Sequence, residues 1–377
     1  MKTISLKCAL TVSVATLSLA GLAFAQGARQ FHPYYLHNVP NGFIHFAADA
    51  QPAVTGLPTW SGSFSYGGQS YTYTMVGADP ATGTSTTIPV TFIPIIFKIG
   101  TVTFDPTQNV NQFPANEITL LEQSPIFTPY PISAGPTSLG NSQYIDAFMR
   151  GNFWGTAQSS GYHLLLGQPT VKHAITLTVP ARYSQTIAIN NPPYNSTIGN
   201  VNINYFQAAI NKILASTKLG LNPSNFVLFV YYNVFFYQGA KTNCCILGFH
   251  SQDGNFTYGT AAFNDPGEFT GSPIEDIEVI THEIGEAVDD PTGGNAVPAW
   301  GNVGQVAGCQ SNLEVGDPVT GAITTIPGTS GFSYHPEDLV FVNWFSRTSP
   351  SPSVNRWYTF LNTFAGYAKA CPPGGSN

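Results

Sequence analysis

The chain has 377 residues, of which 43% are hydrophobic and only 9% are charged, and its formal net charge is −7. About a quarter of the residues of an ordinary soluble domain are charged, so Ser, Thr, Asn, Gln and Gly must supply most of the polarity here. The acidic balance argues against nucleic acid and anionic membranes as partners. The hydrophobic fraction is high enough for a packed core.

The first 25 residues have the pattern of a secretory signal peptide. Lys2 and Lys7 precede an apolar run of small residues, which ends in the small-x-small cleavage site Ala23-Phe24-Ala25. A membrane anchor is the alternative, but the apolar run is short and a cleavage site follows it. No later segment holds about 18 uninterrupted apolar residues. We therefore expect an exported protein, secreted or periplasmic, without stable membrane insertion.

Residues 26–135 are predicted to be rich in β-structure. The stretch WSGSFSYGGQSYTYTMVG, residues 60–77, alternates aromatic and small polar residues, which is typical of a half-exposed hairpin. Residues 86–100 are β-branched and apolar, and their two prolines favour an edge or bulged strand. No linker separates this region from residues 136–377, so the two regions form either two domains or one.

The second half alternates predicted helices and strands. An amphipathic helix is expected at 142–155, and a longer one at 203–217. A strongly apolar strand is expected at 225–237, followed by shorter strands at 244–251 and 255–265.

The stretch SPIEDIEVITHEIGEAVDDP, residues 272–291, is predicted to be a helix. Ser272 is the expected N-cap, Pro273 lies in the first turn, and Glu275 completes a capping box. Pro291 and the glycines that follow it end the helix.

This helix carries the strongest chemical signal in the chain. His282, Glu286 and Asp290 are spaced four residues apart and share one helical face, with Glu278 one turn earlier. In the HExxH motif two histidines bind zinc and the glutamate activates water. Here Glu286 takes the place of the second histidine, and a carboxylate is an acceptable zinc ligand. The pattern predicts a divalent metal site with Glu283 as general base; a solvated acidic helix is the alternative.

Further ligands are expected from two flanking segments. His250 ends the strand CCILGFHS upstream, and Glu314 and Asp317 form an ExxD pair downstream. Either segment completes a three-ligand set. For His250 the alternative is a hydrogen-bonded structural histidine.

These motifs carry a resemblance to a known family. HEIGEAVDDP, then Trp300, then LEVGDP resembles the pattern HE-x-x-E-A-x-x-D-P, tryptophan, E-[IV]-G-D of exported proteins taken for metallopeptidases, distantly similar to the plant phosphate-induced (exordium-like) proteins. It covers about residues 140–347. The resemblance implies an α+β fold, with a zincin-like mixed sheet and an active-site helix preceded by the β-rich region. The site residues that it implies are His250, His282, Glu283, Glu286, Asp290, Glu314 and Asp317.

The chain departs from that pattern in its cysteines. The pattern has a cysteine just after its E-[IV]-G-D segment, where this chain has Pro318. Cys8 leaves with the signal peptide, and the remaining disulfide candidates are Cys244, Cys245, Cys309 and Cys371. Pairing of adjacent cysteines is strained, so Cys309 and Cys371 are each expected to bond to one of the adjacent pair; free buried thiols are the alternative.

Three functions are consistent with the sequence. The first is a zinc-dependent hydrolase that cleaves a peptide or protein, with the metal held by His282, Glu286 and a carboxylate or His250. The second is a non-catalytic exported or cell-surface protein with a structural calcium or zinc site. The third is a carbohydrate-binding protein, and the only support for it is the set of aromatic residues at 60–77. Cross-strand aromatic pairs in a hairpin explain these residues more simply.

Overall fold

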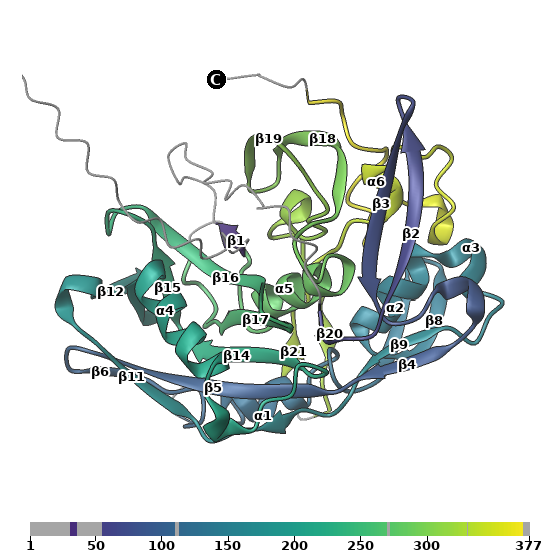
Figure 1. Ribbon diagram of the computed structural model, residues 1–377. Coiled ribbons are helices and arrows are strands. Elements are labelled where there is room, and N and C mark those ends of the chain that lie inside the picture. Colours follow the sequence, from purple (N-terminus) through teal and green to yellow (C-terminus); the bar gives the residue numbers. More distant parts are fainter. Residues whose placement is uncertain (1–30, 36–54, 110–112, 270–271, 330, 372–377) are drawn as a thin grey trace, which may run out of the picture.

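The protein is a strand-rich chain with mixed α- and β-structure (Figure 1). The computed structural model describes residues 31–35, 55–109, 113–269, 272–329 and 331–371. The expected signal peptide, residues 1–25, lies outside the described residues. In the described part of the chain, no helix has both the length and the apolar character needed to cross a membrane.

A large mixed sheet forms the centre of the fold. Its main path runs in the order β10-β5-β14-β17-β16-β15-β13-β12, and β1, β6 and β11 pair with strands of this path. β5, β14 and β17 are parallel to one another, whereas β16 is antiparallel to β17. The bounds are β1 Phe31–Tyr35, β5 Val90–Ile99, β6 Val102–Phe104, β10 Thr170–Val171, β11 Ile175–Val179, β12 Ser184–Asn191, β13 Tyr194–Asn202, β14 Phe226–Tyr232, β15 Val234–Tyr237, β16 Cys244–Asp253 and β17 Phe256–Phe263.

Smaller strand pairs and helices surround this sheet. The other strands are β2 Thr59–Tyr66, β3 Gln69–Val76, β4 Ser85–Ile88, β7 Tyr130–Ala134, β8 Thr137–Ser142, β9 His163–Leu166, β18 Ala296–Val303, β19 Val306–Asn312, β20 Ile326–Pro327 and β21 Ser333–Tyr334. The α-helices are α1 Glu117–Glu122, α2 Tyr144–Asn152, α3 Trp154–Ala157, α4 Ile203–Leu214, α5 Glu278–Asp289 and α6 Val342–Phe345. Short 3₁₀ helices are η1 Pro80–Thr82, η2 Ala181–Tyr183, η3 Thr217–Leu219, η4 Asp317–Val319 and η5 Val354–Arg356.

Most of the expected elements are present. β2 and β3 form the predicted hairpin, and α2 and α4 are the two predicted helices. The single strand expected at 225–237 is two strands, β14 and β15, because Asn233 between them has a positive φ of 49° and β17 and β16 lie between the two strands in the sheet. All seven residues of β14 are buried, as its apolar sequence requires. Phe206 of α4 stacks on Phe236 of β15 with 4.4 Å between ring centroids, so this helix closes one side of the sheet.

The expectation that residues 86–100 form an edge or bulged strand was wrong. β5 lies inside the sheet, with β14 on one side and β10 and β11 on the other. β10 pairs with Thr91 and Phe92, and β11 pairs with Ile95–Ile99. Pro94 lies at the gap between these two partners, so its missing N–H interrupts neither ladder. β5 also joins residues 26–135 and residues 136–377 in one sheet.

The helix of the HExxE motif is shorter than predicted. Ser272 is not its N-cap, because α5 begins at Glu278 with Ile277 as N-cap. Asp276 has a positive φ of 41° and a bridge to Asn264, and its carboxylate accepts a hydrogen bond from the His335 N–H. These contacts hold the segment before α5 out of helical geometry. The helix ends at Asp289, close to the predicted stop.

The disulfide pairing differs from the prediction. Cys244 is bonded to Cys245, and Cys309 is bonded to Cys371. The peptide bond between the adjacent cysteines is cis, and their Cα atoms lie 3.0 Å apart. The second disulfide ties the C-terminal segment to β19.

Candidate metal centre

The predicted site residues converge from separate segments of the chain. His282, Glu283 and Glu286 lie on α5, which packs on β16 and β17 near the centre of the molecule (Figure 1). His250 lies on β16, and the segment after β19 supplies Glu314 and Asp317, with Asp317 opening η4. All six side chains are buried; only Asp317, at 8% exposure, has any notable contact with solvent.

His282 is held at both ring nitrogens. Its Nε2 lies 3.1 Å from Glu286 Oε1 and 3.7 Å from Asp317 Oδ1. Its Nδ1 lies 2.6 Å from Glu337 Oε2, and the other oxygen of Glu337 accepts a hydrogen bond from the Gly321 N–H at 2.7 Å. A carboxylate accepts, so Nδ1 carries a proton. Burial would lower the pKa of His282, but Glu286 and Glu337 raise that pKa well above its ordinary value. Without a metal, Nε2 therefore also donates to the carboxylates, and a bound ion would take the place of that proton.

Gly316, the glycine of the EVGD motif, packs directly against the His282 ring. A Cβ atom at this position would lie 2.3 Å from His282 Nδ1, which explains why glycine is needed. The Gly316 and Asp317 N–H groups donate to Glu286 Oε1 at 3.2 and 3.3 Å. The motif therefore fixes both Glu286 and His282.

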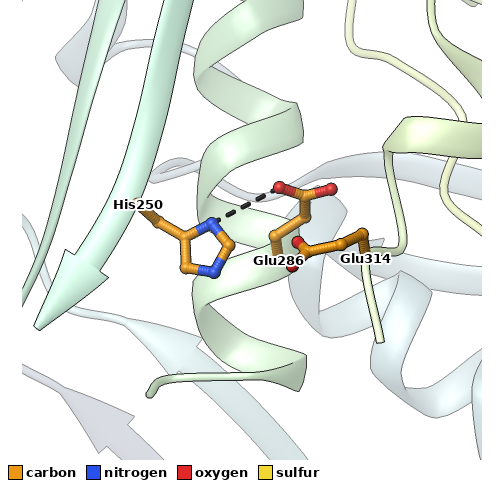
Figure 2. Close-up of side chains that lie close together, drawn as sticks. All are labelled: His250, Glu286 and Glu314. Carbon is orange, nitrogen blue, oxygen red and sulfur yellow. Dashed lines mark ion pairs between the residues drawn. The ribbon is translucent and has the colours of Figure 1, made fainter. Parts of the chain in front are cut away.

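His250 faces the helix from the sheet. Its Nδ1 lies 3.3 Å from Glu286 Oε2 and 3.5 Å from Glu283 Oε2. Figure 2 shows His250 and Glu286 pointing toward each other, with Glu314 approaching Glu286 from the opposite side. On β16, Gly248 leaves room for Glu283, because a Cβ atom there would lie 2.9 Å from Glu283 Cγ.

Side-chain amides orient the two carboxylates that follow β19. Gln305 and Gln310 both donate to Asp317, the latter at 2.9 Å. Asn312 donates to Glu314 Oε1 at 2.5 Å. Both acids are thus positioned by neighbours on the β18–β19 segment.

The last two acids of the helix do not join this group. The Asp290 carboxylate accepts from the Gly294 and Asn295 N–H groups at 2.9 Å each, so it closes the turn after α5. Asp289 is buried elsewhere, near Tyr73, and neither of its carboxylate oxygens has a hydrogen-bond donor among the described residues. The four-residue spacing correctly predicts that His282 and Glu286 lie on one face of α5. It fails for Asp290, because the helix ends at Asp289 and the Asp290 side chain turns to the loop that follows.

The centre contains more acidic side chains than its two histidines can balance if all the acids are ionised. Burial would lower the pKa of His250, but Glu283 and Glu286 raise that pKa to about 10. Burial raises the pKa of Glu283 to about 8. Burial also raises the pKa of Glu314 well above its ordinary value and that of Asp317 to about 7, with Glu286 adding to both. Without a metal, these carboxyl groups hold protons that a cation would displace.

The centre contains two groups of three potential ligand atoms. Within each group, the three atoms lie within 4.8 Å of one another. The groups are His282, Glu286 and Asp317, and His250, Glu286 and Glu314. Imidazole nitrogen with carboxylate oxygen suits zinc and similar transition metals, whereas calcium prefers oxygen ligands alone. A third group, Glu275, Asp276 and His335, is partly exposed; its two acids precede α5, and His335 follows β21.

Glu337, Gln305 and Gln310 were missed by the sequence analysis. Glu337 belongs to the stretch HPEDLVF, where an acidic pair precedes an apolar run, and no periodicity links it to α5. No family model, curated protein or solved structure matches this chain. The family resemblance of the motifs stays a prediction.

Proposed function

We propose that this chain is an exported metal-dependent hydrolase, most simply a zinc peptidase of zincin-like architecture. The observation that supports it most is the 2.6 Å contact between His282 Nδ1 and Glu337, together with the approach of Nε2 to Glu286 and Asp317. A metal-binding histidine usually donates its other N–H to a carboxylate in this way. The motif resemblance and the packing of α5 on a mixed sheet point in the same direction.

The residues have distinct roles in this proposal. His282, Glu286 and Asp317 hold the ion, which, when bound, polarises a carbonyl group and increases the acidity of water. Glu283 is the general base. Its pKa of about 8 is near neutrality, as a group that accepts and returns a proton requires. Glu337 orients His282.

The test compares two acid-to-amide variants of the same helix. We expect Glu283→Gln to lower peptide hydrolysis by about 10²- to 10⁴-fold while the metal content stays unchanged. Asp289→Asn is the matched control, because Asp289 is a buried acid of the same helix that lies outside the centre. Hydrolysis by Glu283→Gln at the wild-type rate would overturn the proposal.

Complete burial favours a second candidate, a structural metal site in an exported protein. His250, His282 and Glu283 expose no surface, whereas a catalytic zinc keeps one position open to water or substrate. In that case chelation lowers thermal stability, and no peptide is hydrolysed by the metal-loaded protein. The two disulfides are compatible with the oxidising compartment that both candidates require.

A further inference from the structure

Glu286 faces a different histidine with each of its two oxygens. Oε1 lies 3.1 Å from His282 Nε2, and Oε2 lies 3.3 Å from His250 Nδ1. One carboxylate thus stands between an imidazole of α5 and an imidazole of β16. Bridging carboxylates occupy this position between paired metal ions.

The two histidines belong to separate ligand groups. Zinc–ligand bonds are about 2.0–2.2 Å long, so two ligands of one ion lie no more than about 4.4 Å apart. Among the described residues, His282 groups with Glu286 and Asp317, His250 groups with Glu286 and Glu314, and no group within 4.8 Å contains both histidines. A single ion in this arrangement therefore takes one histidine and leaves the other.

We propose that the centre binds two divalent ions bridged by Glu286. His282, Glu286 Oε1 and Asp317 hold the first ion, and His250, Glu286 Oε2 and Glu314 hold the second. Two-metal sites in hydrolases place their ions about 3.5–4 Å apart, a separation that one carboxylate spans. This inference rests on the metal binding of the proposed function but not on its catalysis.

The local charge supports a second ion. Ionised and unpaired carboxylates are costly in a protein interior. With both histidines neutral and the carboxylates ionised, one divalent ion leaves three negative charges uncompensated, and two ions leave one. The five carboxylates counted are those of Glu283, Glu286, Glu314, Asp317 and Glu337, all of them buried.

The second support for two ions is that neighbouring side chains fix the orientation of the proposed ligands. Glu337 holds His282, Gln310 holds Asp317, and Asn312 holds Glu314. Such contacts fix metal ligands before the metal arrives. Each proposed ion thus has at least one ligand oriented by a neighbour.

The test is a count of bound ions. Metal-stripped mature protein is titrated with Zn²⁺ and the tightly bound metal is measured. We expect two ions per chain in the wild type and one in each of His250→Ala and His282→Ala. His335→Ala is the control for the separate, partly exposed group, and it should keep both ions.

Any other number of bound ions contradicts part of the proposal. One ion in the wild type overturns the two-ion centre and leaves the proposed hydrolase standing, whereas none overturns both. Loss of one ion in His335→Ala would place the second ion at the separate group and contradict the inference.

Single-ligand variants test the bridge itself. Glu286→Gln should weaken both binding steps, whereas Glu314→Gln and Asp317→Asn should each weaken only one. Weakening of a single step by Glu286→Gln would contradict the bridge. If the variants fail to fold, electron paramagnetic resonance of the wild-type protein loaded with Mn²⁺ is the alternative test. We expect the spectrum of a spin-coupled pair of ions. A spectrum of two uncoupled ions would overturn the bridge.

Discussion

The His282 ring is the most tightly constrained group of the centre. Glu337 holds one nitrogen, Gly316 packs on its face, and Glu286 and Asp317 face the other nitrogen. A ring held this way is pre-organised to bind a cation, because its orientation and the proton on Nδ1 are set before binding.

Removal of the orienting carboxylate should weaken metal binding without removing a ligand. We expect Glu337→Gln to lower the Zn²⁺ affinity about 10- to 100-fold, measured by competition with a chelator. Glu122→Gln, on α1 and outside every ligand group, is the control. Equal affinities for the two variants would show that Glu337 does not position His282.

Gly316→Ala tests the close approach of the EVGD motif to the ring. Gly316 has a φ of −89°, which alanine adopts freely, so any effect comes from the Cβ atom 2.3 Å from His282 Nδ1. We expect a loss of about 1–3 kcal/mol in unfolding free energy from this overpacking, together with weaker metal binding. Gly366→Ala is the control, since nothing lies within 4 Å of its Cβ position. Similar stability of the two variants in denaturant titration would contradict the geometry.

At the scale of elements, α5 shows what the sequence could and could not predict. The spacing of His282 and Glu286 is local, so one helix is enough to place them on one face. The predicted start of the helix at Ser272 was wrong because Asp276 contacts Asn264 and His335, which lie on other segments of the chain. These tertiary contacts keep the residues before Glu278 out of the helix, and the local sequence does not reveal them. Glu337 was missed for the same reason: only the tertiary path brings it to His282.

The two disulfides should differ strongly in their contribution to stability. Cys309–Cys371 spans 62 residues and restrains the unfolded chain, whereas Cys244–Cys245 spans one and closes almost no loop. We expect Cys309→Ser with Cys371→Ser to lower the unfolding free energy by about 2–4 kcal/mol. The double serine variant of the adjacent pair should lose much less. Chemical denaturation measures both, and the reverse order would contradict the pairing.

At the scale of the whole molecule, metal binding and pH should be linked. Burial raises the pKa of Asp290 and Asp317 to about 7 and that of Glu283 to about 8, from unfolded values near 4. Groups with a raised folded pKa stabilise the fold fully below the unfolded pKa, and that stability is lost as the pH rises through the folded pKa. The metal-free protein should therefore lose stability between about pH 4 and pH 8.

A bound metal should offset this loss, because it favours the ionised carboxylates and neutral imidazoles. We expect the difference in Tm between zinc-loaded and chelated protein to widen from about pH 5 to about pH 8. Differential scanning calorimetry measures it. A difference that stays constant or narrows with pH would show that the buried acids do not give up protons to a metal.

Elemental analysis of the purified protein beside a His282→Ala variant shows whether the cluster around α5 binds a transition metal. We expect at least one tightly bound ion per chain in the wild type and a clear loss in the variant. The absence of bound transition metal from the wild type after metal-replete purification would contradict this expectation.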